Sequence, residues 1–399
     1  MFAAFWIIVR NPGIRVATVV LFATGLTNGA TLPYLSIVGI HEFGMSNSTL
    51  SLLLFAIALA NLTCGVSVAI FSDLIADRKP LLLFVQSAGI IGFGLIYLFP
   101  DMTVFIACAV LLVPLSNSSY SLLFASIRSL TSPLGAHDTT SVNQVVRALF
   151  AGAWVLVPGL IALWLVNSGS MLPAWGFAGL VCLFGFLVAL IFMPSSRRAP
   201  DAPKISFLAS LGMTTTPAML SRITAMSLVI ASLRLTAVIQ PLIMTGVVDG
   251  EITDVGFIAG ACALLEIPSM LIWGMLLRKL TVVQALGAGA LIYAAFLAAL
   301  SFATAPWQIY LLLIPNAFGA AAILSLPLTY YQDLLSDRPG LGTSLNQMSS
   351  FVSAGMSAAA FATGAHFLGY SNTAWLGVAM ATSGIAWLFA LERRAAITA

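Results

Sequence analysis

Amide side chains recur inside the apolar stretches of this sequence, at Asn28, Asn61, Asn117, Asn143, Gln144, Gln240, Asn316, Asn346 and Gln347. Amides both donate and accept hydrogen bonds, which suits a hydroxyl-rich or otherwise uncharged polar solute. Three aromatic residues, Trp154, Trp273 and Tyr330, could add flat apolar faces for a sugar ring. We therefore predict a binding site for a small polar solute that contains Asn28, Asn117, Gln144, Trp154, Gln240, Asn316 and Gln347. The alternative, that such amides join helices to one another, stays open for each of them.

Two opposite charges, Arg234 and Glu266, lie deep in neighbouring apolar stretches. An arginine alone near the middle of a membrane costs at least about 2.5–3.5 kcal/mol, so a partner is expected. Glu266 is the only acidic residue that we place at the same depth, and the sequence predicts that the two pair in at least one state. Either the pair is permanent and structural, or Glu266 takes a proton when the pair opens and thereby couples transport to a proton gradient.

A third group of charges forms a compact turn, Ser72–Lys79, in a chain of which only 7% of residues are charged. Apolar stretches run up to this turn and away from it, as expected where two membrane helices turn around in water. We assign Asp73, Asp77, Arg78, Lys79 and Arg147 to a latch that governs conformational switching more than solute affinity.

The elements that position these residues follow from composition. The chain has 399 residues, 60% of them hydrophobic, which is more apolar surface than a soluble protein could bury. We predict an all-α integral membrane protein with 12 transmembrane helices in two six-helix halves. The predicted helices span residues 14–38, 48–72, 80–99, 102–127, 141–166, 172–194, 222–247, 254–277, 281–303, 306–332, 340–368 and 371–391. The predicted domains are an N-terminal bundle (1–194), a cytoplasmic loop between the halves (195–219) and a C-terminal bundle (220–399).

The distribution of charge predicts the orientation of these helices. The basic residues that fall on one side of the layout are Arg10, Arg15, Arg78, Lys79, Arg128, Arg197, Arg198, Lys204, Arg222, Arg278, Lys279, Arg338, Arg393 and Arg394. The loops on the other side carry Glu42, Asp101, Asp249, Glu251 and Asp254. By the positive-inside rule, both termini and the central loop of this multi-pass membrane protein are expected to be cytoplasmic.

Several segments carry a family resemblance. The turn Ser72–Lys79 resembles the loop between helices 2 and 3 of the major facilitator superfamily, although Ala69, Leu74 and Ala76 replace the usual glycine, arginine and glycine. Further segments resemble bacterial sugar efflux transporters, namely Val146–Pro158, Leu265–Pro268, and Tyr331–Leu334 with Arg338–Gly340. The resemblance implies the major facilitator fold and proton-coupled export of sugars or glycoside-like molecules, with the proton gradient as the energy source and no cofactor.

Other functions stay open to different degrees. Efflux of apolar drugs, or solute uptake, would fit the same helices. An intramembrane enzyme would need clustered histidines or carboxylates, yet His41, His137 and His366 lie in or near loops. The four cysteines (Cys64, Cys108, Cys182 and Cys262) have no metal or disulfide spacing. We expect a monomer whose partners are the lipid bilayer and a small-molecule substrate, with neither nucleic acid nor metal.

Overall fold

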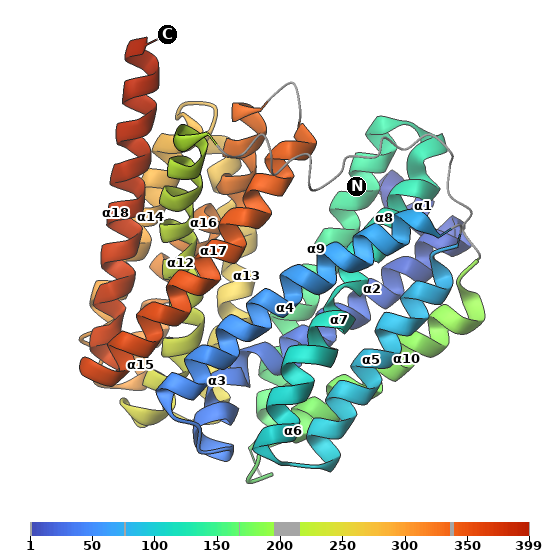
Figure 1. Cartoon of the computed structure of the whole chain (residues 1–399), viewed down its shortest axis with the longest axis horizontal. Coiled ribbons are helices and arrows are strands. Elements are labelled where there is room, and N and C mark those ends of the chain that lie inside the picture. The colour runs from blue at the N-terminus through green and yellow to red at the C-terminus, as the bar shows by residue number, and fades with distance from the viewer. Residues whose placement is uncertain (1, 76, 167, 195–215, 336–338, 399) are drawn as a thin grey trace. The chain divides into compact units, whose positions relative to one another are not determined.

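The computed structural model is helical and describes residues 2–75, 77–166, 168–194, 216–335 and 339–398 (Figure 1). These ranges contain no β-strand element. In the first part of the chain the helices are α1 (Phe2–Arg10), α2 (Pro12–Thr31), α3 (Leu35–Ile37), α4 (Asn47–Leu74), α5 (Lys79–Leu98), α6 (Met102–Ala107), α7 (Val113–Asn117), α8 (Ser119–Thr131), α9 (Ala136–Leu165) and α10 (Pro173–Phe192). In the second part they are α12 (Pro217–Gly246), α13 (Ile252–Leu276), α14 (Val282–Leu300), α15 (Pro306–Leu311), α16 (Leu313–Leu334), α17 (Pro339–Phe367) and α18 (Gly369–Thr398).

Eleven helical stretches in the described ranges are long and apolar enough to cross a membrane. A spanning helix needs about 20 mostly apolar residues, because the hydrocarbon core is about 30 Å thick. The predicted all-helical membrane fold is therefore confirmed. Helix α17 has 29 residues but is not one of the eleven, so the count of exactly twelve spans stays a prediction.

Two of the spans are interrupted, which the sequence analysis did not predict. The first passes from α2 through a 3₁₀ turn (Leu32–Tyr34) and α3 into a π turn (Val38–Glu42). The fourth contains a π turn, Cys108–Leu112, directly before Pro114 at the start of α7. Proline has no backbone N–H and cannot continue the hydrogen-bond ladder, which accounts for a break at this point.

Side-chain caps fix where several helices begin. Asn11 accepts hydrogen bonds from the N–H groups of Gly13 and Ile14 at the start of α2. Asp101 accepts from Thr103 and Val104 at the start of α6, and these backbone hydrogen bonds lower the pKa of its carboxyl group. Each cap satisfies N–H groups that the first helical turn leaves without a partner.

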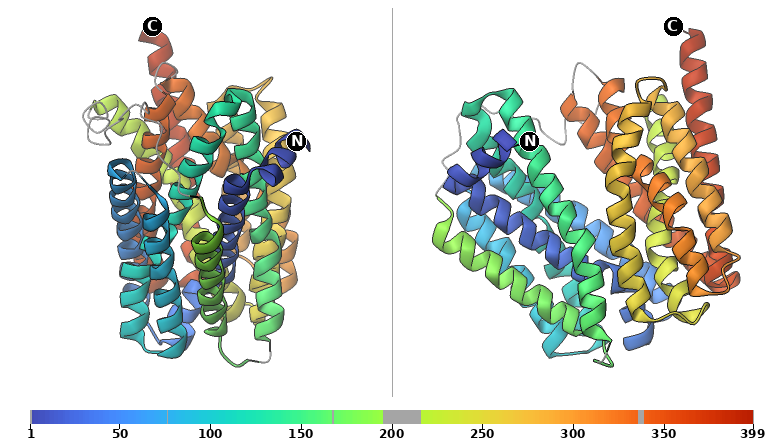
Figure 2. Two further views of the ribbon diagram at one scale, coloured as in Figure 1. Left: turned by 90° about the vertical axis from the view of Figure 1, so that its right-hand side faces the viewer. Right: turned by 180° about the vertical axis from the view of Figure 1, so that it is seen from behind.

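Contacts between Cα atoms divide the chain into two compact units, residues 1–43 with 56–203 and residues 44–55 with 204–399. Most of the predicted central loop, including Arg197, Arg198 and Lys204, lies outside the described residues. Each unit is a bundle of helices, drawn from two further sides in Figure 2, and equivalent pairs of helices pack together in both units. Helix α2 packs on α9 and α10, and α5 on α7 and α10; correspondingly, α12 packs on α17 and α18, and α14 on α16 and α18.

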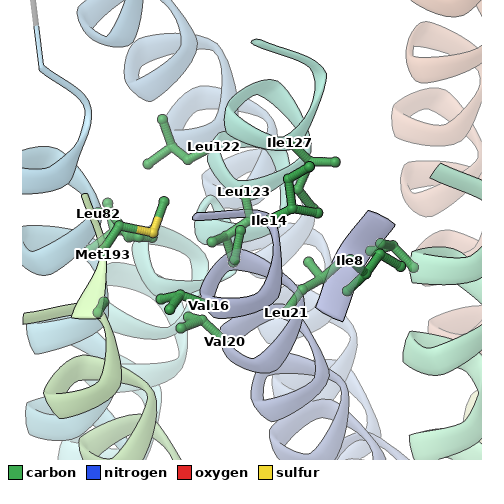
Figure 3. Packing of buried hydrophobic residues seen from close by; sticks show 14 of the residues in the cluster. Ile8, Ile14, Val16, Val20, Leu21, Leu82, Leu122, Leu123, Ile127 and Met193 are labelled. Carbon is green, nitrogen blue, oxygen red and sulfur yellow. The ribbon is translucent and has the colours of Figure 1, made fainter. Parts of the chain in front are cut away.

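The first unit has a buried apolar cluster around α2 (Figure 3). Ile14 and Leu21 of α2 are 0% exposed, and Leu123 of α8 packs in the same cluster. In lipid, helices associate through close van der Waals packing, because the lipid tails are as apolar as the side chains. This packing fixes α2 against α5, α8 and α10, the elements that carry the polar residues described next.

Candidate substrate-binding and coupling sites

A small polar cavity lies inside the first unit, between α2, α5, α7 and α10. Its lining includes two of the predicted substrate residues, Asn28 and Asn117, together with Gln86 of α5. The remaining lining residues are Ala23, Thr24, Thr27, Ser116, Val181 and Cys182. The cavity offers about 10 Å³ to the centre of a water molecule, which is the room that one water needs. The structure thus brings together two residues that lie almost ninety positions apart.

The amides around this cavity differ in their hydrogen bonding. Asn117 donates from Nδ2 to Oδ1 of Asn61 at 3.1 Å, and Asn61 donates to the carbonyl of Ile57. Gln86 is only 2% exposed, and among the described residues its side chain has no hydrogen-bond partner. Gln86 is not one of the predicted substrate residues, although it meets the same criterion as the predicted amides, a polar side chain within an apolar span.

The other predicted substrate residues of the first unit lie on α9, outside the lining of this cavity. Gln144 is exposed, and Trp154 is half-buried. Neither contributes to the cluster that contains Asn28 and Asn117. Their assignment to a binding site remains a prediction.

In the second unit the three predicted amides have different environments. Asn316 of α16 is buried, and Gln347 of α17 is exposed. The Nε2 atom of Gln240 on α12 is buried without a hydrogen-bond partner among the described residues. No hydrogen bond joins these three side chains to one another within those residues.

Arg234 lies on α12 and is held by two serines of α17. Its Nε donates to Oγ of Ser353 at 3.0 Å, and its Nη2 donates to Oγ of Ser350 at 2.7 Å. The side chain of Arg234 is exposed. These bonds turn the guanidinium towards α17.

Glu266 lies on α13 and is only partly exposed. Cys262, one helical turn earlier, donates from Sγ to its Oε1 at 3.6 Å. Within the described ranges no ion pair joins Glu266 to Arg234, because Glu266 bonds within its own helix and Arg234 bonds to α17. A permanent pair is therefore not formed in this structure, and pairing in another conformation stays a prediction.

The latch residues contact α8 of the first unit. Lys79 donates its backbone N–H to Oδ1 of Asp77 at 3.0 Å, which closes the turn before α5. Arg78 donates from Nη1 to the carbonyl of Ala125 at 3.2 Å. The guanidinium of Arg147 lies 5.5 Å from the centre of the Phe124 ring. Both arginines thus contact adjacent positions of one helix, whereas the side chain of Asp73 lies outside the described part of the chain.

Two aromatic residues considered above for sugar stacking are occupied in packing. Trp273 is 2% exposed, and its Nε1 donates to the carbonyl of Phe318 at 2.9 Å. The hydroxyl of Tyr330 accepts from Nε of Arg222 at 3.1 Å and donates to Oε1 of Glu392 at 2.7 Å. Arg222 and Glu392 also form an ion pair at 3.0 Å. Neither ring has a face open to a sugar, since both residues are buried.

The described residues provide no cluster of metal-ligating side chains. They contain no group of three or more His, Cys, Asp or Glu side chains that could hold a metal ion. The polar groups at the cavity and around Arg234 and Glu266 are amides, hydroxyls and thiols, with one guanidinium and one carboxylate. Such groups can bind a solute and, at the carboxylate, exchange a proton.

Comparisons with known proteins agree with this arrangement. A sequence profile of the Major Facilitator Superfamily matches residues 17–358. A Deinococcus radiodurans protein whose name places it among sugar efflux transporters is 26% identical over 385 residues, with 94% of this chain and 97% of that protein covered. Sugar efflux transporter A of Escherichia coli is 26% identical over 342 residues, covering 84% of this chain and 85% of its own length.

Solved structures show the same fold at low sequence identity. The nucleoside transporter NupG has a TM-score of 0.78 at 11% identity, covering 96% of this chain and 98% of its own. The peptide transporter POT in complex with sulfate has a TM-score of 0.78 at 12% identity, covering 96% of this chain and 94% of its own.

Proposed function

Because this chain belongs to the Major Facilitator Superfamily, we propose that it is a secondary active transporter that exports sugars or other small neutral polar solutes by alternating access. The family and the curated relatives are transporters and not enzymes. The relatives named as sugar efflux transporters cover most of the chain and support sugars as the solute class. The proton gradient supplies the energy, and no cofactor takes part.

The observation that carries this proposal is the convergence of Asn28, Gln86 and Asn117 on one cavity inside the first unit. A carboxamide can match a sugar hydroxyl as either donor or acceptor, and it adds no charge that would have to be balanced in the membrane. The cavity holds about one water in this structure, so a sugar requires the lining side chains to separate. Gln144, Trp154, Gln240, Asn316 and Gln347 complete the proposed set of substrate residues.

Proton coupling is assigned to Glu266. A carboxylate within a membrane span is costly when charged, so it gains proton affinity whenever no cation is near. In this structure Arg234 bonds to two serines instead, which is the condition under which Glu266 would hold a proton. In another conformation Arg234 and Glu266 pair, and the proton is released.

The remaining features belong to the same proposal. Asp73, Asp77, Arg78, Lys79 and Arg147 form the conformational latch, and the contacts of Arg78 and Arg147 with α8 support it. A coupling of about 1–3 kcal/mol is typical of such a device. The transporter is a monomer of a bacterial inner membrane, with both termini in the cytoplasm.

Inside-out membrane vesicles test this function directly. An acidic lumen should drive accumulation of sugars or glycosides from a panel that also contains apolar drugs. Accumulation of drugs but not of sugars would indicate multidrug efflux instead of sugar export. Gradient-driven loss of sugar from the lumen would indicate uptake into the cell.

Glu266→Gln tests the coupling, because glutamine mimics the protonated acid. Exchange of solute across the vesicle membrane should persist, while accumulation driven by the gradient should be lost. Glu251→Gln is the control, since Glu251 is exposed in a loop before α13 and should leave accumulation unchanged. Normal accumulation by the Glu266 variant would remove this residue from the coupling mechanism.

A further inference from the structure

Arg234 stands out in the second unit because its charge lacks a carboxylate partner among the described residues. Its two hydrogen bonds go to neutral hydroxyl groups, those of Ser350 and Ser353. Serine hydroxyls orient a guanidinium without neutralising it. A cation at this depth costs at least about 2.5–3.5 kcal/mol in lipid, so an uncompensated one indicates contact with water or with a bound anion.

The surroundings of Arg234 differ from a lipid-facing surface. Between Ser221 and Met244, the positions of α12 that are exposed are Arg234 and Ala237, one turn apart. Gln347 is exposed on α17, one turn before Ser350. By contrast, α10 exposes a stripe of large apolar side chains, as a helix facing lipid does, namely Leu180, Phe184, Leu187 and Ile191. Arg234 therefore lies in a small exposed window on α12, whose other positions in this range are buried or half-buried.

The geometry of the two serine contacts leaves one edge of the guanidinium open. A guanidinium has a side edge, formed by Nε–H and one N–H of Nη2, and an end edge formed by Nη1 and Nη2. Ser353 and Ser350 occupy the side edge. Within the described residues the end edge donates to no acceptor. Two parallel N–H groups at that edge match the two oxygens of a carboxylate or a phosphate.

We propose that the open edge of Arg234 binds an anionic group of the transported solute, so that the solute class is a sugar bearing one carboxylate or phosphate. The serines hold the guanidinium in position, and Gln347, on the same face of α17, can contact a hydroxyl group of the same solute. The proposal rests on the sugar export proposed above, and it replaces the neutral solutes considered there by sugars that carry one acidic group. The same edge of Arg234 cannot hold Glu266 and the solute at once, so solute binding and the pairing with Glu266 exclude each other.

Binding of matched glycosides to the purified full-length protein tests this site. Methyl glucoside is the neutral probe, and methyl glucuronide and methyl glucoside 6-phosphate are its carboxylate and phosphate counterparts. The wild-type protein should bind at least one anionic probe about tenfold or more tighter than the neutral probe, since hydrogen bonds between charged groups are the strong ones. The preferred anionic probe then identifies the group that Arg234 binds.

Variants of the two arginines of α12, Arg222 and Arg234, show which residue causes the preference for an anionic probe. Arg234→Gln should bring the affinity ratio of anionic to neutral probe to about one, and Arg234→Lys, which keeps the charge but loses the planar fork, should retain part of it. Arg222→Gln is the matched control and should keep the wild-type ratio, because Arg222 already has Glu392 as a partner at 3.0 Å. A general loss of folded protein does not change the affinity ratio, because both probes bind the same folded fraction.

The outcomes separate this site from the proposed function. Equal affinity of the wild-type protein for neutral and anionic probes, or an unchanged ratio in Arg234→Gln, would overturn the anion site while leaving sugar export standing. Failure to bind any of the three glycosides would overturn both, because the anion site presupposes a sugar as substrate.

Discussion

The side chain of Gln86 is buried inside the first unit, and no other described residue hydrogen-bonds to its carboxamide. Its amide lines the polar cavity, which has room for about one water molecule. Asn117 lines the same cavity but hydrogen-bonds to Asn61, so its amide contributes to packing as well. Asn117 therefore joins two helices, whereas Gln86 makes no such contact and is the amide of this cavity that we propose to bind solute.

Replacement of these two amides by leucine should have opposite effects on stability. We expect Gln86→Leu to raise the free energy of unfolding slightly, by no more than about 1 kcal/mol, and to weaken sugar binding, because no described protein group hydrogen-bonds to this amide in the proposed site. Asn117→Leu should lower stability, since it removes the donor that hydrogen-bonds to Oδ1 of Asn61. Unfolding in detergent and the Kd for a bound glycoside measure both effects; a destabilised Gln86→Leu protein would show that Gln86 serves packing instead.

Sequence patterns identified some of the polar residues that line the cavity and missed others. Asn28 and Asn117 were predicted because amides are rare in apolar stretches, and the structure places both at one cavity. The same patterns cannot show which polar residues find partners, since Arg234 and Ser350 are 116 residues apart. Trp273 and Tyr330 were considered for sugar stacking because the sequence does not show that neighbouring helices bury them. Burial of this kind depends on the tertiary structure.

Helices α5, α7 and α10 approach one another closely at Gly89, next to the polar cavity. A Cβ atom at Gly89 would lie 2.8 Å from Sγ of Cys182 and would also clash with Oγ of Ser116. Both of these residues line the cavity. The absence of a side chain at Gly89 therefore sets the spacing of the helices that form it.

A methyl group at this position should be poorly tolerated. We expect Gly89→Ala to lower the free energy of unfolding by about 1–3 kcal/mol, because overpacking forces neighbouring helices apart. Gly94→Ala in the same helix is the control, since a Cβ there meets no atom within 4 Å. That control should be neutral or should gain up to about 1 kcal/mol from the better helix propensity of alanine. Equal thermal unfolding of the two variants would contradict a close approach at Gly89.

The positions of most helices followed from apolar length, but their continuity did not. The stretch predicted at 254–277 is α13, Ile252–Leu276, and the stretch predicted at 340–368 is α17, Pro339–Phe367. The stretch predicted at 102–127 contains a π turn and three short helices, and α18 continues to Thr398 beyond the predicted end at 391. Hydropathy measures how much of a segment is apolar and does not detect a change in the backbone hydrogen-bond pattern.

For the molecule as a whole, the recurrence of the same helix contacts in both units is consistent with two related halves, as the family fold implies. Orientation in the membrane follows from the partition of charge, which is a property of the entire sequence. Because basic side chains flank the central loop and the C-terminal helix, both should lie in the cytoplasm.

Reporter fusions test that orientation. A reporter after Ala399 and one inserted within residues 199–202 should both report the cytoplasm, and one inserted near Gly250 should report the outside. The physical reason is the cost of moving lysine and arginine across the membrane during insertion. Opposite sides for the first two reporters would overturn the arrangement of six helices on each side of the central loop.

The open edge of Arg234 has a consequence for the electrical work of transport. A neutral solute exchanged for one incoming proton moves one positive charge inwards, whereas an anion exported in the same exchange moves the equivalent of two. Each charge is worth about 2.3 kcal/mol per 100 mV of membrane potential, so binding an anion doubles the electrical driving force of the cycle. A transporter with this arginine would be electrogenic to a degree set by its cargo, and the current per molecule exported would report the charge of that cargo.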